Sequence, residues 1–214
     1  MIFQRYFFNH SGTFGEIGAY DGLTFSNTIG LARHGWKGIL VEPDPALFQL
    51  CASNLQDFKK CEVRNIAISS RNTKANLYRQ GPLSTLSTDL HERYQTIDWA
   101  KGEVDKGEIE VNCVTLDSLL KEAKIDPEFE LLVVDVEGHE TEVFAGFSIE
   151  HWKPQMIILE LADLHPDFPE LEKVCLDLKN HIENNSYKVI YKDHINTIFI
   201  SSGKFQEKML SFNN

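Results

Sequence analysis

Side chains that can take up a proton are concentrated in one short segment, DVEGHE, at residues 135–140. The segment follows the apolar run LLVV, which predicts a buried strand, so it begins at the carboxyl end of that strand. A neutral hydroxyl is a poor nucleophile, and a carboxylate or an imidazole beside it can remove its proton. We therefore predict Asp135, Glu137 and His139 as catalytic residues. The alternative for His139 and Glu140 is an ordinary helix start, where acids are favourable.

The same segment offers oxygen ligands of the kind that Mg²⁺ and Mn²⁺ prefer. Its spacing does not require an ion, so the sequence predicts no metal ligand, although these acids are compatible with a divalent metal. A metal-dependent hydrolase that uses the acids of residues 135–140 is one alternative function. It would leave a second motif, the glycine turn near the N-terminus, without a role.

That second motif is FGEIGAYDG, residues 14–22, which places two glycines and two carboxylates after an apolar start. A dinucleotide fingerprint starting at Gly18 would need glycine at the positions of Tyr20 and Leu23. Asp21 would also repel a phosphate at the helix start. S-adenosylmethionine has no phosphate and carries a sulfonium and an ammonium group, which carboxylates attract. The turn therefore favours S-adenosylmethionine over NAD.

Acids and amides at the ends of the next two predicted strands complete the cofactor site. Glu42 could accept hydrogen bonds from both ribose hydroxyls, and residues 65–67 would lie beside the adenine. Ser84 is included because GPLSTLS, with Ser84, Thr85 and Ser87, could close over the ligand, although a plain loop fits equally well. The predicted cofactor-binding residues are Glu16, Gly18, Ala19, Tyr20, Asp21, Gly22, Thr24, Ser26, Asn27, Glu42, Pro43, Asn65, Ile66, Ala67, Ser84 and Asp135.

The elements that must position these residues alternate between strand-length apolar runs and segments of helical period, which predicts an α/β, doubly wound, mostly parallel sheet. The closing run YKVIYKDHINTIFIS predicts a hairpin that adds an antiparallel strand at the sheet edge. Strands are predicted at 13–18, 38–42, 61–69, 108–114, 129–135 and 155–163, and helices at 24–35, 43–58, 115–123, 138–147 and 169–185.

Residues 80–107 lose this periodicity and turn polar, with Tyr94 and Trp99 among them. An irregular stretch of that length inside a compact domain is usually a lid or a disordered loop. We predict one domain over residues 1–214, with a lid or substrate segment at 80–107.

Composition excludes several classes of protein. The formal net charge of −11 argues against nucleic acid as a partner, because phosphate binding needs a basic field. No apolar run is long enough to span a membrane, and the first twelve residues do not have the pattern of a signal peptide. The four cysteines form no CxxC pair and are expected as buried free thiols. We predict a cytoplasmic protein, of undetermined oligomeric state, that binds neither nucleic acid nor membrane.

The sequence resembles the FkbM-type methyltransferases from about Gly12 to Ile200. The matching segments are FGEIGAYDGLTFSNT, GWKGILVEPDPALFQL, NIAIS, VTLDSLL, LLVVDVEGHETEVFAGF and MIILEL. The resemblance implies a class I, S-adenosylmethionine-dependent enzyme with a seven-stranded Rossmann-like sheet and the cofactor over Glu16, Gly18, Glu42 and residues 65–67. Many members O-methylate sugars or natural products, so the expected partner is a small-molecule or glycan acceptor. A non-catalytic cofactor-binding module with the same fold is the other alternative.

Overall fold

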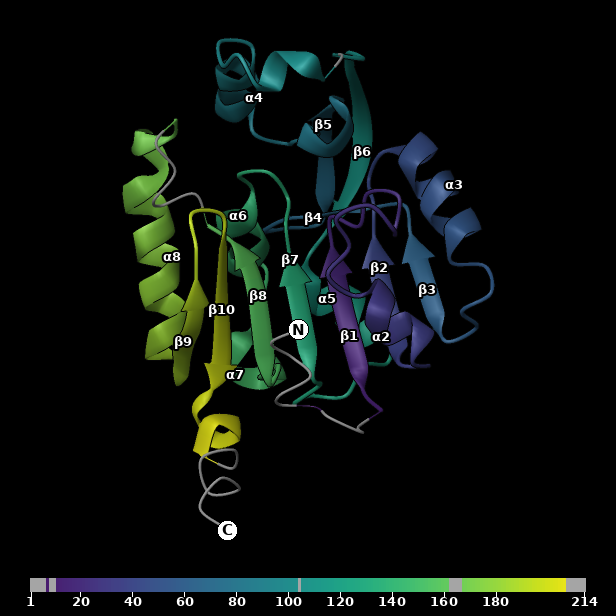
Figure 1. Ribbon diagram of the computed structural model, residues 1–214, viewed down its shortest axis with the longest axis vertical. Coiled ribbons are helices and arrows are strands. Elements are labelled where there is room, and N and C mark those ends of the chain that lie inside the picture. The colour runs from purple at the N-terminus through teal and green to yellow at the C-terminus, as the bar shows by residue number, and fades with distance from the viewer. Residues whose placement is uncertain (1–6, 8–10, 104, 162–166, 207–214) are drawn as a thin grey trace.

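A computed structural model describes residues 7, 11–103, 105–161 and 167–206. Most of the first twelve residues, for which a signal peptide was not expected, lie outside the described residues. So do the last two residues of the strand predicted at 155–163. The centre of the molecule is a seven-stranded, mostly parallel sheet (Figure 1) of the order β3-β2-β1-β7-β8-β10-β9. Its strands are β1 (Thr13–Ile17), β2 (Lys37–Val41), β3 (Cys61–Arg64), β7 (Leu131–Val134), β8 (Met156–Glu160), β9 (Tyr187–Lys192) and β10 (Asn196–Ser201).

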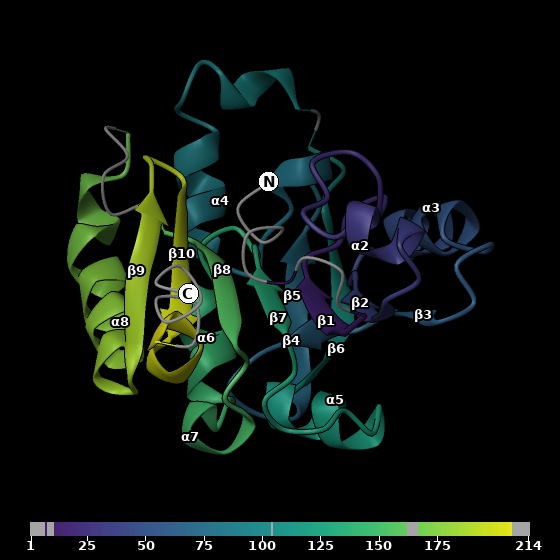
Figure 2. The same ribbon diagram turned by 60° about the horizontal axis from the view of Figure 1, so that its bottom comes forward.

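Helices cover both faces of this sheet, because alternate residues of the central strands are buried on opposite sides. In β7, Leu132 and Val134 belong to one apolar cluster, whereas Leu131 and Val133 belong to the other. Figure 2 shows α5 and α7 on one side of the sheet and α2 on the other. The first cluster includes residues of α5 (Leu116–Glu122), α6 (Glu140–Ala145), α7 (Ile149–Trp152) and α8 (Glu172–Asn184); the second includes residues of α2 (Ile29–Arg33) and α3 (Pro45–Asn54). The α/β, doubly wound prediction is confirmed.

The strand predicted at 61–69 is two strands in two different sheets. β3 ends at Arg64, and the side chain of Asn65 donates hydrogen bonds to the carbonyl oxygens of Glu42 and Pro43, both at 2.9 Å. The chain then leaves the large sheet and enters a three-stranded sheet of the order β4-β6-β5. Its strands are β4 (Ala67–Ile68), β5 (Thr73–Tyr78) and β6 (Glu108–Val114). β5 was not predicted, because its sequence TKANLY is largely polar and five of its six residues are exposed or half-buried without alternation.

The hairpin prediction is confirmed, but its place in the sheet differs. β10 is antiparallel to both β8 and β9 and lies between them, so β9 occupies the edge. The antiparallel strand is therefore second from the edge. Ile198, Phe199 and Ile200 of β10 are all buried, so both faces of this strand are covered.

The helix predicted at 24–35 is shorter than its sequence pattern indicates, because α2 covers only Ile29–Arg33. Residues 26–28 do not join it, since their donors point at the carboxylate of Glu16. The Ser26 hydroxyl accepts hydrogen bonds from the backbone N–H groups of Thr28 and Ile29, which satisfies part of the helix start.

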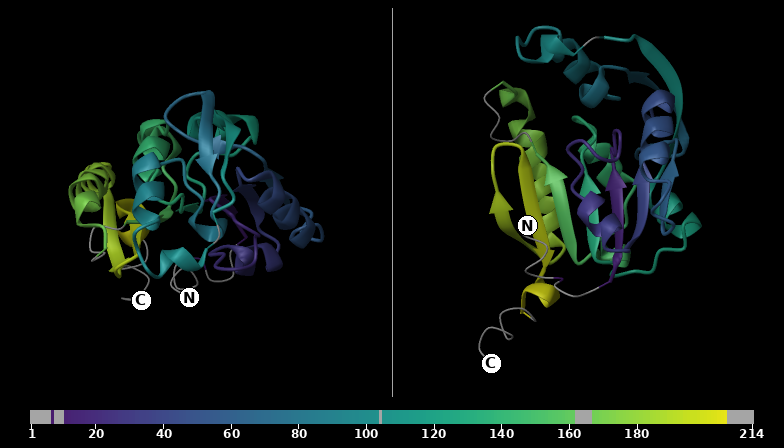
Figure 3. Two further views of the ribbon diagram at one scale, coloured as in Figure 1. Left: turned by 90° about the horizontal axis from the view of Figure 1, so that it is seen from above. Right: turned by 45° about the vertical axis from the view of Figure 1, so that its right-hand side comes forward.

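Residues 80–107 are not irregular where the structure describes them. They contain the 3₁₀ turns η1 (Gly81–Leu83) and η2 (Ala100–Gly102) and the helix α4 (Thr88–Tyr94), which the Ser87 side chain caps. Leu90, Tyr94, Ile97 and Ala100 pack with Phe168 in a small apolar cluster. Figure 3 shows this segment above the upper ends of the parallel strands, next to the loops that follow them.

Gly18 allows β1 and β7 to approach each other. It has a φ of +88°, and an added Cβ would overlap the carbonyl oxygen of Asp135, which is backbone and cannot rotate away. We expect Gly18→Ala to lower the free energy of unfolding by roughly 3 kcal/mol or more, measured by urea denaturation.

Gly35 is the matched control for this variant. Its φ of +77° is similar, but nothing lies within 4 Å of an added Cβ. Gly35→Ala should therefore cost only the conformational term, about 1 kcal/mol. Equal costs for the two variants would contradict the overlap at Gly18.

Candidate active site

A cavity of about 560 Å³ lies at the carboxyl ends of β1, β2 and β7. This is the position at which open α/β sheets bind ligands. The predicted residues that line it are Glu16, Gly18, Ala19, Tyr20, Thr24, Ser26, Asn27, Glu42, Pro43, Ala67, Ser84, Asp135, Glu137 and His139. Side chains from the first loop, the second strand end, the three-stranded sheet and the DVEGHE turn thus line one cavity.

The remaining four predicted cofactor residues support the loops around the cavity instead of lining it. The carboxylate of Asp21 accepts hydrogen bonds from the backbone N–H groups of Leu23 and Thr24. Gly22 lies against Cys51, Asn65 binds the backbone after β2, and Ile66 packs on the apolar core. Asp21 therefore stabilises the shape of the turn. Burial would raise the pKa of its carboxyl group, but the hydrogen bonds outweigh burial and lower it.

Glu16 is the deepest acid of the site and is only 3% exposed. Its carboxylate accepts hydrogen bonds from the Thr28 hydroxyl at 2.6 Å, the Asn27 backbone N–H at 3.1 Å and the Ser26 hydroxyl at 3.2 Å. Burial raises the pKa of Glu16 to about 7, and these hydrogen bonds offset only part of that effect. The carboxylate thus holds the loop that forms one wall of the cavity.

Glu42, at the end of β2, stabilises the glycine turn that follows β1. Its carboxylate accepts hydrogen bonds from the backbone N–H groups of Tyr20 at 2.9 Å and Asp44 at 2.8 Å. Tyr20 has a φ of +50°, so the bond from its N–H stabilises a backbone conformation that is unfavourable for tyrosine. Burial raises the pKa of Glu42 to about 8. Each oxygen of this side chain accepts one of these bonds and has room for another, so Glu42 can still bind a ligand hydroxyl.

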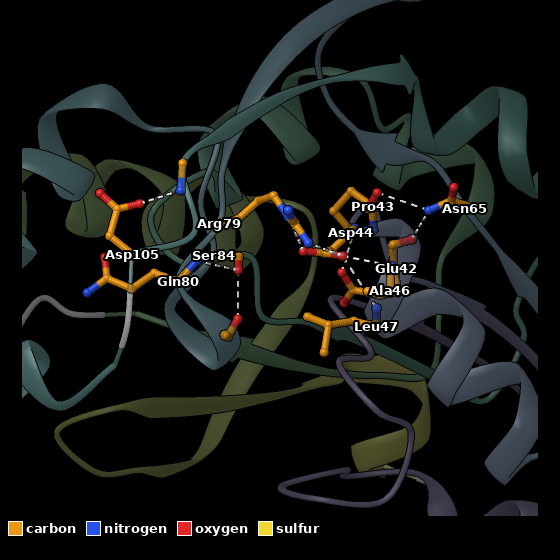
Figure 4. A network of polar contacts seen from close by, with 12 residues as sticks. Glu42, Pro43, Asp44, Ala46, Leu47, Asn65, Arg79, Gln80, Ser84 and Asp105 are labelled. Atoms are coloured by element: carbon orange, nitrogen blue, oxygen red, sulfur yellow. Dashed lines mark hydrogen bonds and ion pairs between the residues drawn. The ribbon is translucent and has the colours of Figure 1, made fainter.

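An ion pair joins the small sheet to the large one beside this site (Figure 4). Arg79, directly after β5, donates from Nε to the Asp44 carboxylate at 2.7 Å, and the same carboxylate caps α3 through the backbone N–H of Ala46. These contacts hold the pKa of Asp44 below its usual range, although burial opposes them. No local pattern predicts a role for Arg79, because its partner is 35 residues away in the chain.

The DVEGHE turn is held by contacts that aim Glu137 at the cavity. Glu137 has a φ of +53°, and its backbone carbonyl accepts a hydrogen bond from the Thr85 hydroxyl at 2.6 Å. The Tyr94 hydroxyl donates to its carboxylate. Glu140 accepts hydrogen bonds from the backbone N–H groups of Val136 and Gly138, so it stabilises the turn and does not face solvent. Burial and the charge of Asp135 raise the pKa of Glu137 well above its usual value.

His139 lies at the same turn, and its Nε2 is 3.1 Å from the hydroxyl of Ser69. Burial lowers the pKa of the imidazole, with Glu142 acting in the opposite direction, so the neutral ring is favoured near pH 7. A neutral imidazole can accept a proton, but one of its nitrogens is already paired with Ser69.

Glu160, at the end of β8, joins this group and was not among the predicted catalytic residues. Because β8 is the neighbour of β7, carboxylate oxygens of Asp135, Glu137 and Glu160 lie within 4.8 Å of one another. The like charges and burial raise the pKa of Glu160 well above its usual value. Three oxygen ligands at this spacing could hold a divalent cation, and the same group can instead share protons.

No Lys or Arg is among the described residues that line the cavity. A pyrophosphate would find no cationic partner there and would meet Glu16, Glu42 and Asp135. A cationic ligand without phosphate fits these groups.

The sheet order and the glycine turn at its carboxyl edge define a Rossmann-like fold of the class I methyltransferase type. The family model described as the methyltransferase FkbM domain matches residues 16–189. The chain belongs to this family, and the predicted resemblance is confirmed. No curated protein matches the chain by sequence.

Solved structures with a similar fold support the same class. They include a methyltransferase FkbM from Methylobacillus flagellatus KT, with a TM-score of 0.53, 15% identity, and coverage of 89% of this chain and 43% of that one. Monomeric WbdD gives a TM-score of 0.52 and 14% identity, with coverage of 94% and 40%. A putative O-methyltransferase from Klebsiella pneumoniae gives 0.50 and 12%, with coverage of 89% and 73%. The chain thus spans less than half the length of the first two. No helix among the described residues is long and apolar enough to cross a membrane.

The buried acids make stability depend on pH. In the unfolded chain these carboxyl groups lose their protons near pH 4.5, whereas in the folded protein Glu42 keeps its proton up to about pH 8. The folded state therefore binds more protons, and the free energy of unfolding falls as pH rises through this range. We expect Glu42 alone to contribute a fall of about 3 kcal/mol between pH 5.5 and pH 8, measured by urea denaturation.

Glu42→Gln should reduce this fall, because the amide does not titrate. Exposed Glu150 supplies the control, Glu150→Gln, which should leave the slope unchanged. The lowered pKa of His139 makes the free energy of unfolding rise with pH. This contribution is present in the wild type and in both variants, so it does not affect the comparison. A slope that is equal in wild type and Glu42→Gln would show that Glu42 does not carry the effect.

Proposed function

We propose that this protein is an S-adenosylmethionine-dependent O-methyltransferase acting on a hydroxyl of a small-molecule or glycan acceptor. The observation that carries the proposal is the acid-lined, phosphate-excluding cavity at the carboxyl edge of a methyltransferase fold. When bound, the cofactor would supply a methyl group on a positively charged sulfur. Glu16 and Asp135 are the acids we assign to that charge, and Glu42 is the residue we assign to the ribose hydroxyls, as a hydrogen-bonding partner.

Asp135 is the residue we assign as the base. It follows β7 at the cavity wall, and its backbone N–H is fixed by a 3.0 Å hydrogen bond to the Ile17 carbonyl oxygen. Glu137 is less suitable, because the Tyr94 hydroxyl already donates a hydrogen bond to its carboxylate, and burial raises its pKa well above the usual value. His139 is paired with Ser69. In the proposed step Asp135 would take the proton of the acceptor hydroxyl while the hydroxyl oxygen bonds to the methyl carbon; the bond from that carbon to the cofactor sulfur would break, and S-adenosylhomocysteine would leave.

Glu137 and His139 then act as positioning residues for the acceptor hydroxyl and the turn. We further propose that residues 80–107 close over the site, that nucleic acid and membrane are not partners, and that the protein works in the cytoplasm. The acidic cavity supports the absence of a nucleic-acid partner, because it offers no basic field to phosphates.

Asp135→Asn tests the assignment. It keeps the shape of the side chain but removes its capacity to take a proton, so methyl transfer should fall by 10²-fold or more. Binding of S-adenosylhomocysteine, measured by calorimetry, should change by less than tenfold. Glu150→Gln is the control for both measurements.

Three outcomes would count against the proposal. Full activity of Asp135→Asn would remove it as the base. Cofactor binding without transfer to any acceptor would favour a non-catalytic module. Hydrolysis that EDTA abolishes and that needs no cofactor would favour a metal-dependent hydrolase using Asp135, Glu137 and Glu160.

A further inference from the structure

A second cavity, of about 220 Å³, adjoins the first. Four residues line both of them: Leu83, Trp99, Glu137 and Ile195. The second cavity lies between the 80–107 segment and the side of α8, and the DVEGHE turn forms its floor. A molecule placed in it would have one end at Glu137, where the two cavities meet.

The walls of this second cavity are mainly aliphatic. They come from η1, α4, the residue after β8, η4 (Pro169–Leu171) and α8. The aliphatic side chains are those of Leu83, Leu90, Leu161, Leu171, Val174 and Leu178. Burial of an apolar ligand against such side chains is favourable, because it removes apolar surface from water.

Three aromatic rings close one side of the cavity. Tyr94, Trp99 and Phe168 contact one another edge to face, with ring centroids 5.9 to 6.3 Å apart. Trp99 also donates from Nε1 to the Asp167 carboxylate at 2.9 Å, and Arg93 donates to the Asp167 carbonyl oxygen at 2.9 Å. These bonds join the 80–107 segment to the chain before α8 and keep the rings in place.

The polar side chains of the lining include Glu137, Glu140, Thr141, Glu160 and His194, and two of these carboxylates already have hydrogen-bond partners. Glu140 binds backbone N–H groups, and the Tyr94 hydroxyl donates to Glu137. No Lys or Arg occurs among the described lining residues. A sugar ring would bury several hydroxyls without partners, which is costly, and a phosphate would have no counter-charge beside Glu137 and Glu160.

We propose that the second cavity binds the body of the methyl acceptor, and that the acceptor is an uncharged or cationic hydroxyl compound with an aryl or alkyl body. The hydroxyl points to the junction at Glu137, and the apolar body lies between the aromatic rings and α8. This inference rests on the proposed function and narrows its acceptor class, away from free sugars and sugar nucleotides.

A binding experiment tests the cavity independently of turnover. The probe is 2-naphthol, a neutral hydroxyl compound with an apolar body, titrated calorimetrically into protein saturated with S-adenosylhomocysteine. Val174→Trp places a large ring in the cavity from α8 and should weaken 2-naphthol binding at least tenfold. Val174 is 47% exposed, so the larger side chain does not disrupt the core.

Leu176→Trp is the matched control, because Leu176 lies on the same helix with 44% exposure and is not among the residues lining the cavity. It should bind 2-naphthol as wild type does. Both variants should bind S-adenosylhomocysteine within twofold of wild type, since the first cavity is unchanged.

Equal 2-naphthol affinities in the two variants would overturn the inference. So would an absence of 2-naphthol binding at millimolar concentration, or tighter binding of UDP-glucose than of 2-naphthol to the wild type. Failure of S-adenosylhomocysteine to bind the wild type would contradict the proposed function instead. In that case 2-naphthol is titrated without it, and the comparison of the two variants still decides the inference.

Discussion

The buried carboxylate of Glu16, at the end of β1, organises the first loop of the molecule. It draws in the donors of Ser26, Asn27 and Thr28, so the chain runs across the mouth of the cavity before α2 begins. A buried acid that lost these donors would be left unsatisfied at a cost of several kcal/mol. The same contacts therefore stabilise the loop and shape the cavity, and the loop cannot be rearranged without exposing or stranding this carboxylate.

The acids of the site oppose the stability of the folded protein. Burial raises the pKa of Glu16 and Glu140 to about 7 and that of Glu42 to about 8, so each of these carboxyl groups becomes costly as pH rises. Carboxyl groups with strongly shifted pKa values cluster at functional sites, even though they lower the stability of the folded protein. A cationic ligand would relieve the repulsion among these acids, which gives a physical reason for keeping them.

The three-stranded sheet and the 80–107 segment add a second layer to the methyltransferase fold. Arg79 joins this layer to α3, the Thr85 hydroxyl holds Glu137, and Trp99 reaches the chain before α8. All three contacts connect the added layer to loops at the carboxyl edge of the large sheet. The layer thus contacts the DVEGHE turn directly, while the position of the turn follows from β7 in the large sheet.

By itself, the sequence determined the α/β class, the strand-end positions of Glu16, Glu42 and Asp135, and the acidic character of the glycine turn. All of these depend on the local periodicity of apolar residues and on residues that are close together in the chain. Only the tertiary structure placed Glu160 beside Asp135, Tyr94 beside Glu137, and Arg79 beside Asp44. Those pairs depend on the order of the strands in the large sheet and on where the three-stranded sheet and residues 80–107 pack against it. It also divided the strand predicted at 61–69 and shortened the helix predicted at 24–35, because contacts of Asn65 and Glu16 with distant backbone overrode the local pattern.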